Sequence, residues 1–301
     1  MPLRPRQDGR RRRKGPCPSP GGHDGLMDHR RTESYFDGRA AGYGQLSWHA
    51  GYAERLVELA GLTPGMRVLD AATGTGLAAL AAARAVGPSG QVVGVDISAG
   101  MLREADRLLT ASGLTNVSYV KADATALDGF DDEAFDVVLC CAGLLYLRAS
   151  AAFAAWRRVL KPGGLLGFSA MRAGFPRAAR VFRECARDFG LALIDPMAEV
   201  GTEDSSRTAV AEAGLVYERA VPDVIALPPR NAADLWRGHV VSPNYSEVAS
   251  LSPEETAAFE ARYHARVSEL LNEPDAFDLP VIYVYARKPG RAGRREAAAM
   301  P

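Results

Sequence analysis

The sequence lacks long apolar runs and an excess of charge of either sign. A membrane-spanning helix needs about 20 consecutive apolar residues, and no segment of the 301-residue chain reaches that length. The 36 basic and 36 acidic side chains cancel, so the protein has no overall field that would attract nucleic acid or an anionic membrane. We therefore expect a small-molecule partner, and neither nucleic acid nor a membrane.

Cysteine and secretory features are also scarce. The four cysteines, Cys17, Cys140, Cys141 and Cys185, lack the spacing of a zinc site. Cys140 and Cys141 are neighbours in an apolar run, where successive side chains of a strand point to opposite faces, and we interpret the cysteines as buried, reduced thiols. The N-terminus has no apolar core of a secretory signal. Together with the lack of a spanning segment, this predicts a cytoplasmic protein.

Two terminal stretches hold almost nothing that a core could bury. Residues 1–26 carry seven arginine or lysine residues among prolines and glycines, and residues 290–301 have the composition of a frayed tail. We predict that both are disordered; a nucleic-acid or membrane arm is the alternative for the first. Residues 27–289 then form one domain, because a hydrophobic content of 47% suffices for a full core.

What the sequence does contain is a strand, a glycine turn and a helix in immediate succession. The apolar run 68–69 ends at Asp70, and Gly74 and Gly76 bracket a turn that leads into the alanine-rich stretch 77–85. Glycine removes the Cβ atoms that would hold a ligand away from the main chain. We predict a ligand site here, although a Gly-x-Gly after a strand occurs in dinucleotide enzymes and methyltransferases alike.

Carboxylates also end the next two strands. Asp96 follows the buried strand 92–95 and lies 20 residues beyond Gly76, which suits an acidic group that accepts hydrogen bonds from both hydroxyls of a ribose. Asp123 follows a third strand, 117–121. It could border an adenine ring and accept from its amino group, and a turn cap is the alternative.

Strands and helices go on alternating along the chain. Ser98 is placed to cap a helix that runs to residue 109, the fourth strand spans 135–141, and a tight turn at 161–164 leads into a fifth strand, 165–169. Such alternation predicts an α/β fold with a doubly wound, mostly parallel sheet that helices cover on both faces.

After residue 171 the alternation breaks. The expected elements are a helix over 176–189, a polar stretch at 201–206, a helix ending at 213, a strand over 215–227, a helix capped by Ser252 with Glu255 in the capping-box position, and a closing strand at 279–286. We divide the domain into a cofactor half, 34–170, substrate-side insertions, 171–278, that form a helical lid, and the closing strand.

Aromatic residues are concentrated before the first strand. Tyr35, Phe36, Tyr43 and Trp48 come ahead of, or begin, a helix with one apolar face. These rings either close over a cofactor or pin the segment to the core, and both alternatives stay open.

Four motifs taken together resemble the class I S-adenosylmethionine-dependent methyltransferases. They are VLDAATGTG at 68–76, VVGVDIS at 92–98, KADA at 121–124 and RVLKPGGLL at 158–166. The resemblance is closest to the branch of the ubiquinone and menaquinone methyltransferases, whose Ser-x-x-Met-Leu opening stands here at 98–102. It implies S-adenosylmethionine as the cofactor and a seven-stranded sheet with a last antiparallel strand, here 279–286.

The resemblance also implies a role for each residue that matches a motif. It places the methionine part beside Asp70, Ala72, Gly74 and Gly76, the ribose and adenine beside Asp96, Ile97 and Met101, the adenine edge at Asp123 and Ala124, the sulfonium beside Cys141, and Tyr35 and Tyr43 in a covering segment.

The methyl acceptor is less well defined. The chain has no Asn-Pro-Pro-Tyr-like run after the fourth strand, and that loop lacks the carboxylate cluster of magnesium-dependent catechol enzymes, so we predict no metal. Apolar and aromatic insertions favour a hydrophobic or aromatic metabolite, with oxygen, nitrogen and carbon all open as the acceptor atom. Tyr146 and His239 are the candidate bases; His49 is either a further candidate or a helix cap, and we interpret His264 as structural.

Two other functions remain as alternatives. An NAD(P)-dependent oxidoreductase would use Gly74, Gly76 and Ala79 as a loose G-x-G-x-x-A with Asp96 as the ribose acid. Against it, the chain has no Tyr-x-x-x-Lys pair, and Asp70 stands where it would repel a pyrophosphate. A non-catalytic methyltransferase fold that only binds a ligand is the second alternative. We expect a monomer or a homodimer.

Overall fold

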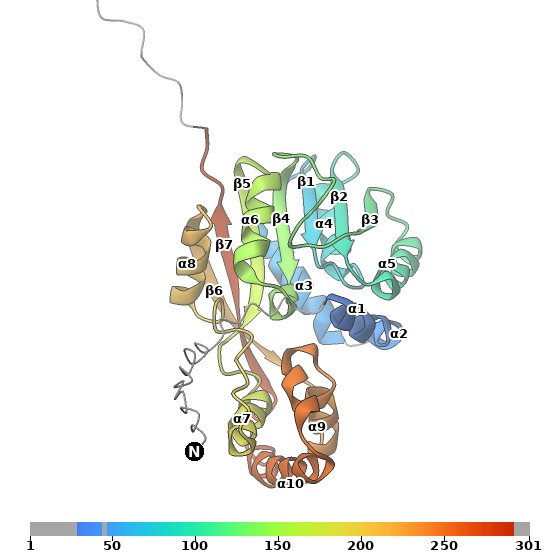
Figure 1. Ribbon diagram of the computed structural model, residues 1–301. Helices are drawn as coiled ribbons and strands as arrows, with labels where there is room; N and C mark the ends of the chain where they lie inside the picture. The colour runs from blue at the N-terminus through green and yellow to red at the C-terminus, as the bar shows by residue number, and fades with distance from the viewer. Residues whose placement is uncertain (1–28, 44–46, 292–301) are drawn as a thin grey trace, which may run out of the picture.

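The computed structural model describes residues 29–43 and 47–291, and it consists of one seven-stranded sheet with helices on both faces (Figure 1). The predicted disordered stretch 1–26, and all but two residues of 290–301, lie outside the described residues. The strands are β1 (Arg67–Ala71), β2 (Gln91–Asp96), β3 (Val117–Lys121), β4 (Phe135–Cys141), β5 (Leu160–Met171), β6 (Val216–Ala226) and β7 (Asp278–Arg287).

The strand order is β3-β2-β1-β4-β5-β7-β6. The pairs among β1 to β5 are parallel, whereas β7 runs antiparallel to both β5 and β6. The predicted fold class and the antiparallel closing strand are therefore confirmed. Because Asp70 pairs with Gly94 on one side and Leu139 on the other, the carboxyl ends of β1, β2 and β4 meet at one edge of the sheet.

The helices of the described residues cover the two faces of the sheet, apart from three that form a separate group. They are α1 (His29–Asp37), α2 (Ala40–Tyr43), α3 (Ser47–Ala60), α4 (Leu77–Val86), α5 (Ala99–Ser112), α6 (Ala149–Val159), α7 (Arg177–Ala186), α8 (Glu203–Glu212), α9 (Ala232–Val240) and α10 (Pro253–Leu270), with short 3-10 helices η1 (Gly143–Tyr146), η2 (Arg187–Phe189) and η3 (Pro243–Ser250).

Each face of the sheet has its own apolar core. On one face α6 and α8 pack over the strands, with Phe153 and Trp156 fully buried; on the other, α3 and α4 do so through Leu56 and other apolar side chains. Cys140 belongs to the first core and Cys141 packs against the second. The predicted opposite orientation of these neighbouring thiols is thus confirmed.

Two helix caps form as predicted. The Ser98 side chain accepts a hydrogen bond from the main-chain nitrogen of Met101, and Gly113 ends α5 in the left-handed conformation. α10 begins with a full capping box, in which the side chains of Ser252 and Glu255 each accept a hydrogen bond from the other's main-chain nitrogen.

β5 starts at Leu160 rather than at residue 165, and the predicted turn at 161–164 is a bulge within this strand. Phe135 pairs with Leu160 but Val137 pairs with Leu165, so the register shifts here, and Gly163 has a left-handed φ of 78°. Gly163 donates its main-chain N–H to the Lys288 carbonyl, at 2.9 Å, and Lys288 donates to the Gly164 carbonyl, at 3.0 Å. These hydrogen bonds attach the bulge to the residue that follows β7.

The region predicted as a lid, 171–278, serves two different purposes. β6 completes the sheet by pairing with β7 over Val216–Ala226, and α8 packs against one face of the sheet. α7, α9 and α10 instead enclose a third core of aromatic residues, and we call this part the helical unit; it lies at the lower end of the view in Figure 1. Within it, Arg183 contacts Asp195 at 2.9 Å and Tyr245 Oη at 3.0 Å.

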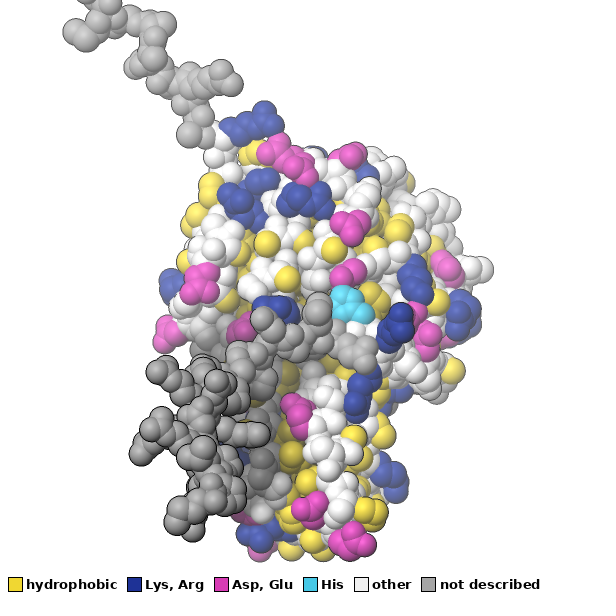
Figure 2. All heavy atoms as spheres, in the orientation of Figure 1, with side chains coloured by type: hydrophobic (Ala, Val, Ile, Leu, Met, Phe, Trp, Pro, Cys, Tyr) yellow, Lys and Arg dark blue, Asp and Glu magenta, His cyan; other side chains and the backbone are white. Residues whose placement is uncertain are grey.

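The surface agrees with the balanced composition. On the face seen in Figure 2, basic and acidic side chains are interspersed over the described residues. Within 29–43 and 47–291, no helix combines the length and apolar character needed to cross a membrane.

Candidate functional site

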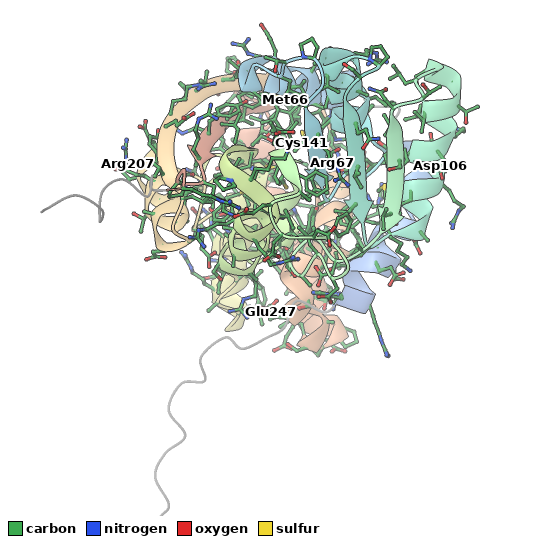
Figure 3. All side chains as sticks on the ribbon, turned by 90° about the horizontal axis from the view of Figure 1, so that it is seen from above. Met66, Arg67, Asp106, Cys141, Arg207 and Glu247 are labelled. Atoms are coloured by element: carbon green, nitrogen blue, oxygen red, sulfur yellow. The ribbon has the colours of Figure 1, made fainter. Side chains whose placement is uncertain are left out.

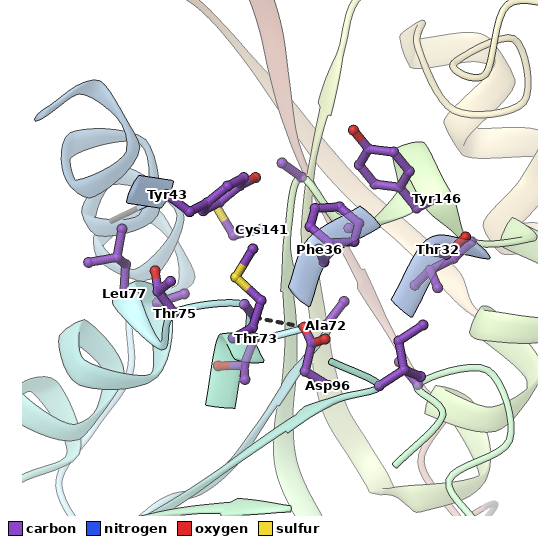
Figure 4. A pocket seen from close by; sticks show the side chains of 18 of the residues that line it. Thr32, Phe36, Tyr43, Ala72, Thr73, Thr75, Leu77, Asp96, Cys141 and Tyr146 are labelled. Carbon is purple, nitrogen blue, oxygen red and sulfur yellow. Dashed lines mark hydrogen bonds between the residues drawn. The ribbon is translucent and has the colours of Figure 1, made fainter. Parts of the chain in front are cut away.

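A cavity lies at the carboxyl edge of β1, β2 and β4. It encloses about 1020 Å³, including space open to solvent, and α1, α2 and the start of α3 form its other side. In an open parallel sheet this edge is where ligands bind. Figure 4 shows the side chains that point into it.

The glycine turn contributes main chain rather than side chains. Ala72 and Gly74 both line the cavity with positive φ angles of 55° and 54°. No atom lies within 4 Å of the position that a Cβ on Gly74 would occupy, so the open space reaches the backbone there. This is the close approach that the sequence predicted.

Gly76 is required for close packing, and its contact with the ligand stays a prediction. It lies outside the cavity lining, at the start of α4, with φ at 80°. A Cβ on it would stand 2.2 Å from Tyr119 Oη, on the neighbouring β3 side. Close packing against this tyrosine, together with the left-handed backbone, excludes any larger residue.

Asp70 likewise lies beneath the turn instead of in the cavity lining. Its Oδ2 accepts a hydrogen bond from Thr73 Oγ1 at 2.5 Å, and its exposed fraction is 1%. Burial raises the pKa of Asp70 to about 7. The Asp70 side chain therefore supports the turn from below, while Thr73 itself lines the cavity.

Asp96 lines the cavity and ties it to the turn. Its Oδ2 accepts from the Gly74 nitrogen and its Oδ1 from the Ser98 nitrogen, both at 2.9 Å. Burial raises its pKa. Each carboxylate oxygen can accept a further hydrogen bond, so the carboxylate can hold the turn and still bind two hydroxyls. Ile97 and Met101 line the cavity beside it.

Asp123 forms the turn cap that the sequence offered as the alternative to an adenine contact. Its Oδ1 accepts from the nitrogen and the hydroxyl of Thr125, both at 2.7 Å, which makes it a turn cap. Its Oδ2 lies 3.5 Å from His29 Nδ1, and Asp123, Ala124 and His29 all line the cavity. The adenine contact stays a prediction.

An aromatic wall, formed by Phe36, Tyr43 and Tyr146, closes the cavity opposite the turn. The ring centroids of Phe36 and Tyr146 are 4.8 Å apart, and those of Phe36 and Tyr43 are 6.1 Å apart. Tyr43 lies beside Cys141, which also lines the cavity (Figure 4). Burial raises the pKa of Tyr43 to about 12 and that of Tyr146 well above its ordinary value.

α1 is attached to the rest of the domain by polar contacts. Asp37 Oδ1 accepts from Ser98 Oγ at 2.6 Å and from the Gly100 nitrogen at 2.7 Å, and Glu33 pairs with Lys121 at 2.6 Å. These contacts place the aromatic segment over the cavity, although Tyr35 itself packs on Phe36 without lining it.

His239 is not part of this cavity, which corrects its prediction as a candidate base. It lies in the third core, 4.9 Å from the Phe182 ring and 6.1 Å from that of Tyr245 between centroids. Burial lowers the pKa of His239 to about 3. α9 packs on α7 and α10, away from the carboxyl edge of the sheet, and carries this histidine with it.

His49, for which the sequence leaves both a base and a helix cap open, lines the cavity, and so does Tyr52, which the sequence places only on an apolar helix face. Their spacing of three residues on α3 was the available signal, because residues three apart share one face of a helix. Among the described residues, no group of three or more His, Cys, Asp or Glu side chains could hold a metal ion.

Comparison with known proteins agrees with this geometry. Residues 68–164 match a family model described as a methyltransferase domain. The chain is 44% identical to the ubiquinone/menaquinone biosynthesis C-methyltransferase UbiE of Ectopseudomonas mendocina over 129 residues, which cover 42% of this chain and 50% of that protein. It is 38% identical to the UbiE of Pseudomonas putida over 168 residues, or 51% of this chain and 65% of that protein. The matches thus span between half and 65% of these relatives.

Two solved structures share the fold. A candidate methyltransferase of Bacillus halodurans superposes with a TM-score of 0.54 at 24% identity, and the YcgJ protein of Bacillus subtilis with 0.53 at 18%; each covers 79% of this chain and 98% of the other. The findings confirm the predicted resemblance to class I methyltransferases and S-adenosylmethionine as the cofactor of such a domain.

Proposed function

We propose that this chain, which carries a class I S-adenosylmethionine-dependent methyltransferase domain, transfers a methyl group to a small hydrophobic or aromatic metabolite. One observation carries the proposal: a single cavity joins the glycine turn and Asp96 to the aromatic wall. A cofactor bound along the turn and an acceptor held against the wall would therefore share one enclosed space.

The residues at the turn fit the cofactor. The open space at Gly74 admits a group against the main chain, and Asp96 offers acceptors for two ribose hydroxyls. Asp123 offers a carboxylate for the adenine amino group, and the aromatic face of Tyr43, beside Cys141, attracts a cation such as a sulfonium. When bound, S-adenosylmethionine supplies an electrophilic methyl group.

The chain's own contribution is mainly to position the reactants. Holding two reactants in line can lower a barrier by roughly 7 to 11 kcal/mol in favourable cases. The aromatic wall orients a flat acceptor and excludes water. Because burial raises the pKa of Tyr146 well above its ordinary value, this residue remains a neutral hydrogen-bond donor at neutral pH, and we assign it to holding the acceptor rather than to removing its proton.

The relatives support the aromatic character of the acceptor. Their names describe C-methyltransferases of ubiquinone and menaquinone biosynthesis, and the wall here offers three rings for stacking. The oxidoreductase alternative is not favoured, because the matching family and relatives are methyltransferases. Product analysis distinguishes methyl transfer from the non-catalytic alternative, in which the protein only binds a ligand.

The test is to incubate the protein with S-adenosylmethionine and a panel of phenols, quinols and amines, and to follow S-adenosylhomocysteine and the methylated product by mass spectrometry. Asp96→Ala, which removes the predicted ribose contact, is the negative control. We expect turnover with an aromatic acceptor. Binding of the cofactor without turnover of any acceptor class would contradict the proposal and favour a ligand-binding protein.

A further inference from the structure

His49 has one ring nitrogen engaged, and the other has no hydrogen-bond partner among the described residues. Its Nδ1 lies 3.1 Å from the main-chain carbonyl oxygen of Tyr43. A carbonyl only accepts, so in the neutral ring Nδ1 must carry the hydrogen. Nε2 then holds the free lone pair, and no described residue forms a hydrogen bond with it.

The surroundings keep this imidazole neutral and oriented. The ring stacks on Tyr43 with centroids 4.7 Å apart and planes at 13°, which fixes its direction. Burial lowers the pKa of His49, and the positive charge of Arg39 lowers it further, against the opposing effect of the Tyr43 carbonyl. His49 is therefore in the base form at neutral pH, and it lines the cavity.

Tyr52 provides a matching donor from the same helix face. It follows His49 by three residues on α3 and also lines the cavity. Its exposed fraction is 3%, and its Oη has no hydrogen-bond partner within the described part of the chain. The neighbouring Ser169 hydroxyl accepts from the Ala142 nitrogen and donates to Cys141 Sγ, and it does not form a hydrogen bond of acceptable geometry with Tyr52 Oη. A buried hydroxyl without a partner is costly, so a ligand that supplies an acceptor atom here is favoured.

We propose that His49 Nε2 accepts the proton of a methyl acceptor with an acidic O–H group, of the phenol class, while Tyr52 donates a hydrogen bond to the same oxygen. This rests on the proposed function and names its substrate class. The O–H bond breaks and its proton moves to Nε2; the electron pair left on oxygen forms the new O–C bond, and the S–C pair stays with the donor sulfur, which becomes a neutral thioether. A flat phenol ring also suits the aromatic wall.

The protonation state can be tested without cofactor or acceptor. Long-range ¹H–¹⁵N correlation spectra of the ¹⁵N-labelled protein report which imidazole nitrogen carries hydrogen, and His49→Gln identifies the His49 signals by their loss. We expect a neutral ring at pH 7 with hydrogen on Nδ1. Hydrogen on Nε2, or a fully protonated ring, would overturn the proposal.

The catalytic role is tested with phenol and 4-nitrophenol as acceptors, at a pH above the pKa of 4-nitrophenol and below that of phenol. His49→Gln should lower kcat for phenol by about 10² to 10⁴-fold, but should change it little for 4-nitrophenol, which is already ionised. His264→Gln, on α10 outside the cavity, is the matched control and should leave both rates unchanged.

The affinity for S-adenosylhomocysteine separates the two proposals. His49→Gln should retain the affinity for S-adenosylhomocysteine within about twofold, because the substitution removes only the group that accepts the proton. If wild-type protein fails to bind S-adenosylhomocysteine, the proposed function itself falls. The wild type can also bind S-adenosylhomocysteine and methylate neither phenol, or the rates for phenol and 4-nitrophenol can fall equally in His49→Gln. Either result would show that the role of His49 is wrong, while the methyltransferase assignment stands.

Discussion

The main-chain nitrogen of Gly74 donates a 2.9 Å hydrogen bond to Oδ2 of Asp96, and so joins two motifs that lie 22 residues apart in the chain. The carboxylate at the end of β2 thereby fixes the conformation of the turn that follows β1. Asp96, which is predicted to bind the ribose, and the turn at Gly74 therefore form one structural unit. Both line the same cavity, so a ligand that binds to Asp96 would lie beside the turn.

The packing of Gly76 against Tyr119 predicts a large cost for Gly76→Ala. The added Cβ would meet Tyr119 Oη at 2.2 Å, so overpacking of about 1 to 3 kcal/mol adds to backbone strain of about 1 to 2 kcal/mol. Gly113→Ala is the control, because Gly113 has a similar φ of 69° with nothing within 4 Å. Urea unfolding should show a clearly larger loss for Gly76→Ala, and equal losses would contradict the packing account.

Asp70 predicts a pH dependence of stability. Its pKa in the folded state is about 7, above its ordinary value of 3.8, so between these values the folded protein binds more protons than the unfolded chain. The free energy of unfolding should therefore fall as pH rises through this window, by at most about 1.4 kcal/mol per pH unit from this group. Asp70→Asn should flatten the dependence, whereas Asp106→Asn, on the outer side of α5 (Figure 3), should not.

The helical unit should depend on its partly buried ion pair. Arg183→Ala removes the charged partner of Asp195, which keeps hydrogen bonds from the main-chain nitrogens of Gly174 and Met197, and also removes the partner of Tyr245 Oη. The loss of hydrogen bonds to a charged group should cost about 1.5 to 3 kcal/mol. Tyr245→Phe removes one hydrogen bond and should cost about 1 kcal/mol. Thermal or urea unfolding measures both. A loss for Arg183→Ala no greater than that for Tyr245→Phe would mean that the pair does not stabilise the unit.

His239→Phe tests the correction to the candidate base. Because His239 lies in the third core among aromatic rings, a ring of similar size should preserve methyl transfer within about twofold, while His49→Gln lowers it by about 10² to 10⁴-fold for a neutral phenol. Measured rates that fall more for His239→Phe than for His49→Gln would reverse this assignment.

Much of the fold follows from local patterns in the sequence. β4 has the predicted bounds, because an apolar run with sharp polar ends defines a buried parallel strand. β3, a partly exposed strand at the edge of the sheet, has the predicted bounds as well. The start of β5 could not be predicted in this way. Pro-Gly-Gly is typical of a turn, and here it forms a bulge inside a longer strand, which hydrogen bonds with the distant Lys288 hold in place.

The site was predicted where a motif fixes the main chain, and missed where packing decides. Gly74 and Asp96 line the cavity as expected, but the same motif does not reveal that Asp70 and Gly76 lie outside its lining. The choice between His49 and His239 depends on how α3 and α9 dock, which involves contacts far apart in the chain. A sequence alone carries no direct signal for that docking.

Calorimetric titration with S-adenosylhomocysteine, NAD and NADP tests the central claim most directly. We expect S-adenosylhomocysteine to bind, and Asp96→Ala to weaken it by about a hundredfold or more, because two hydrogen bonds to a charged group contribute roughly 1.5 to 3 kcal/mol each. Asp106→Ala, at an exposed carboxylate on α5, should bind like wild type. Binding of NAD or NADP alone, or an Asp96→Ala variant with undiminished affinity for S-adenosylhomocysteine, would contradict the account.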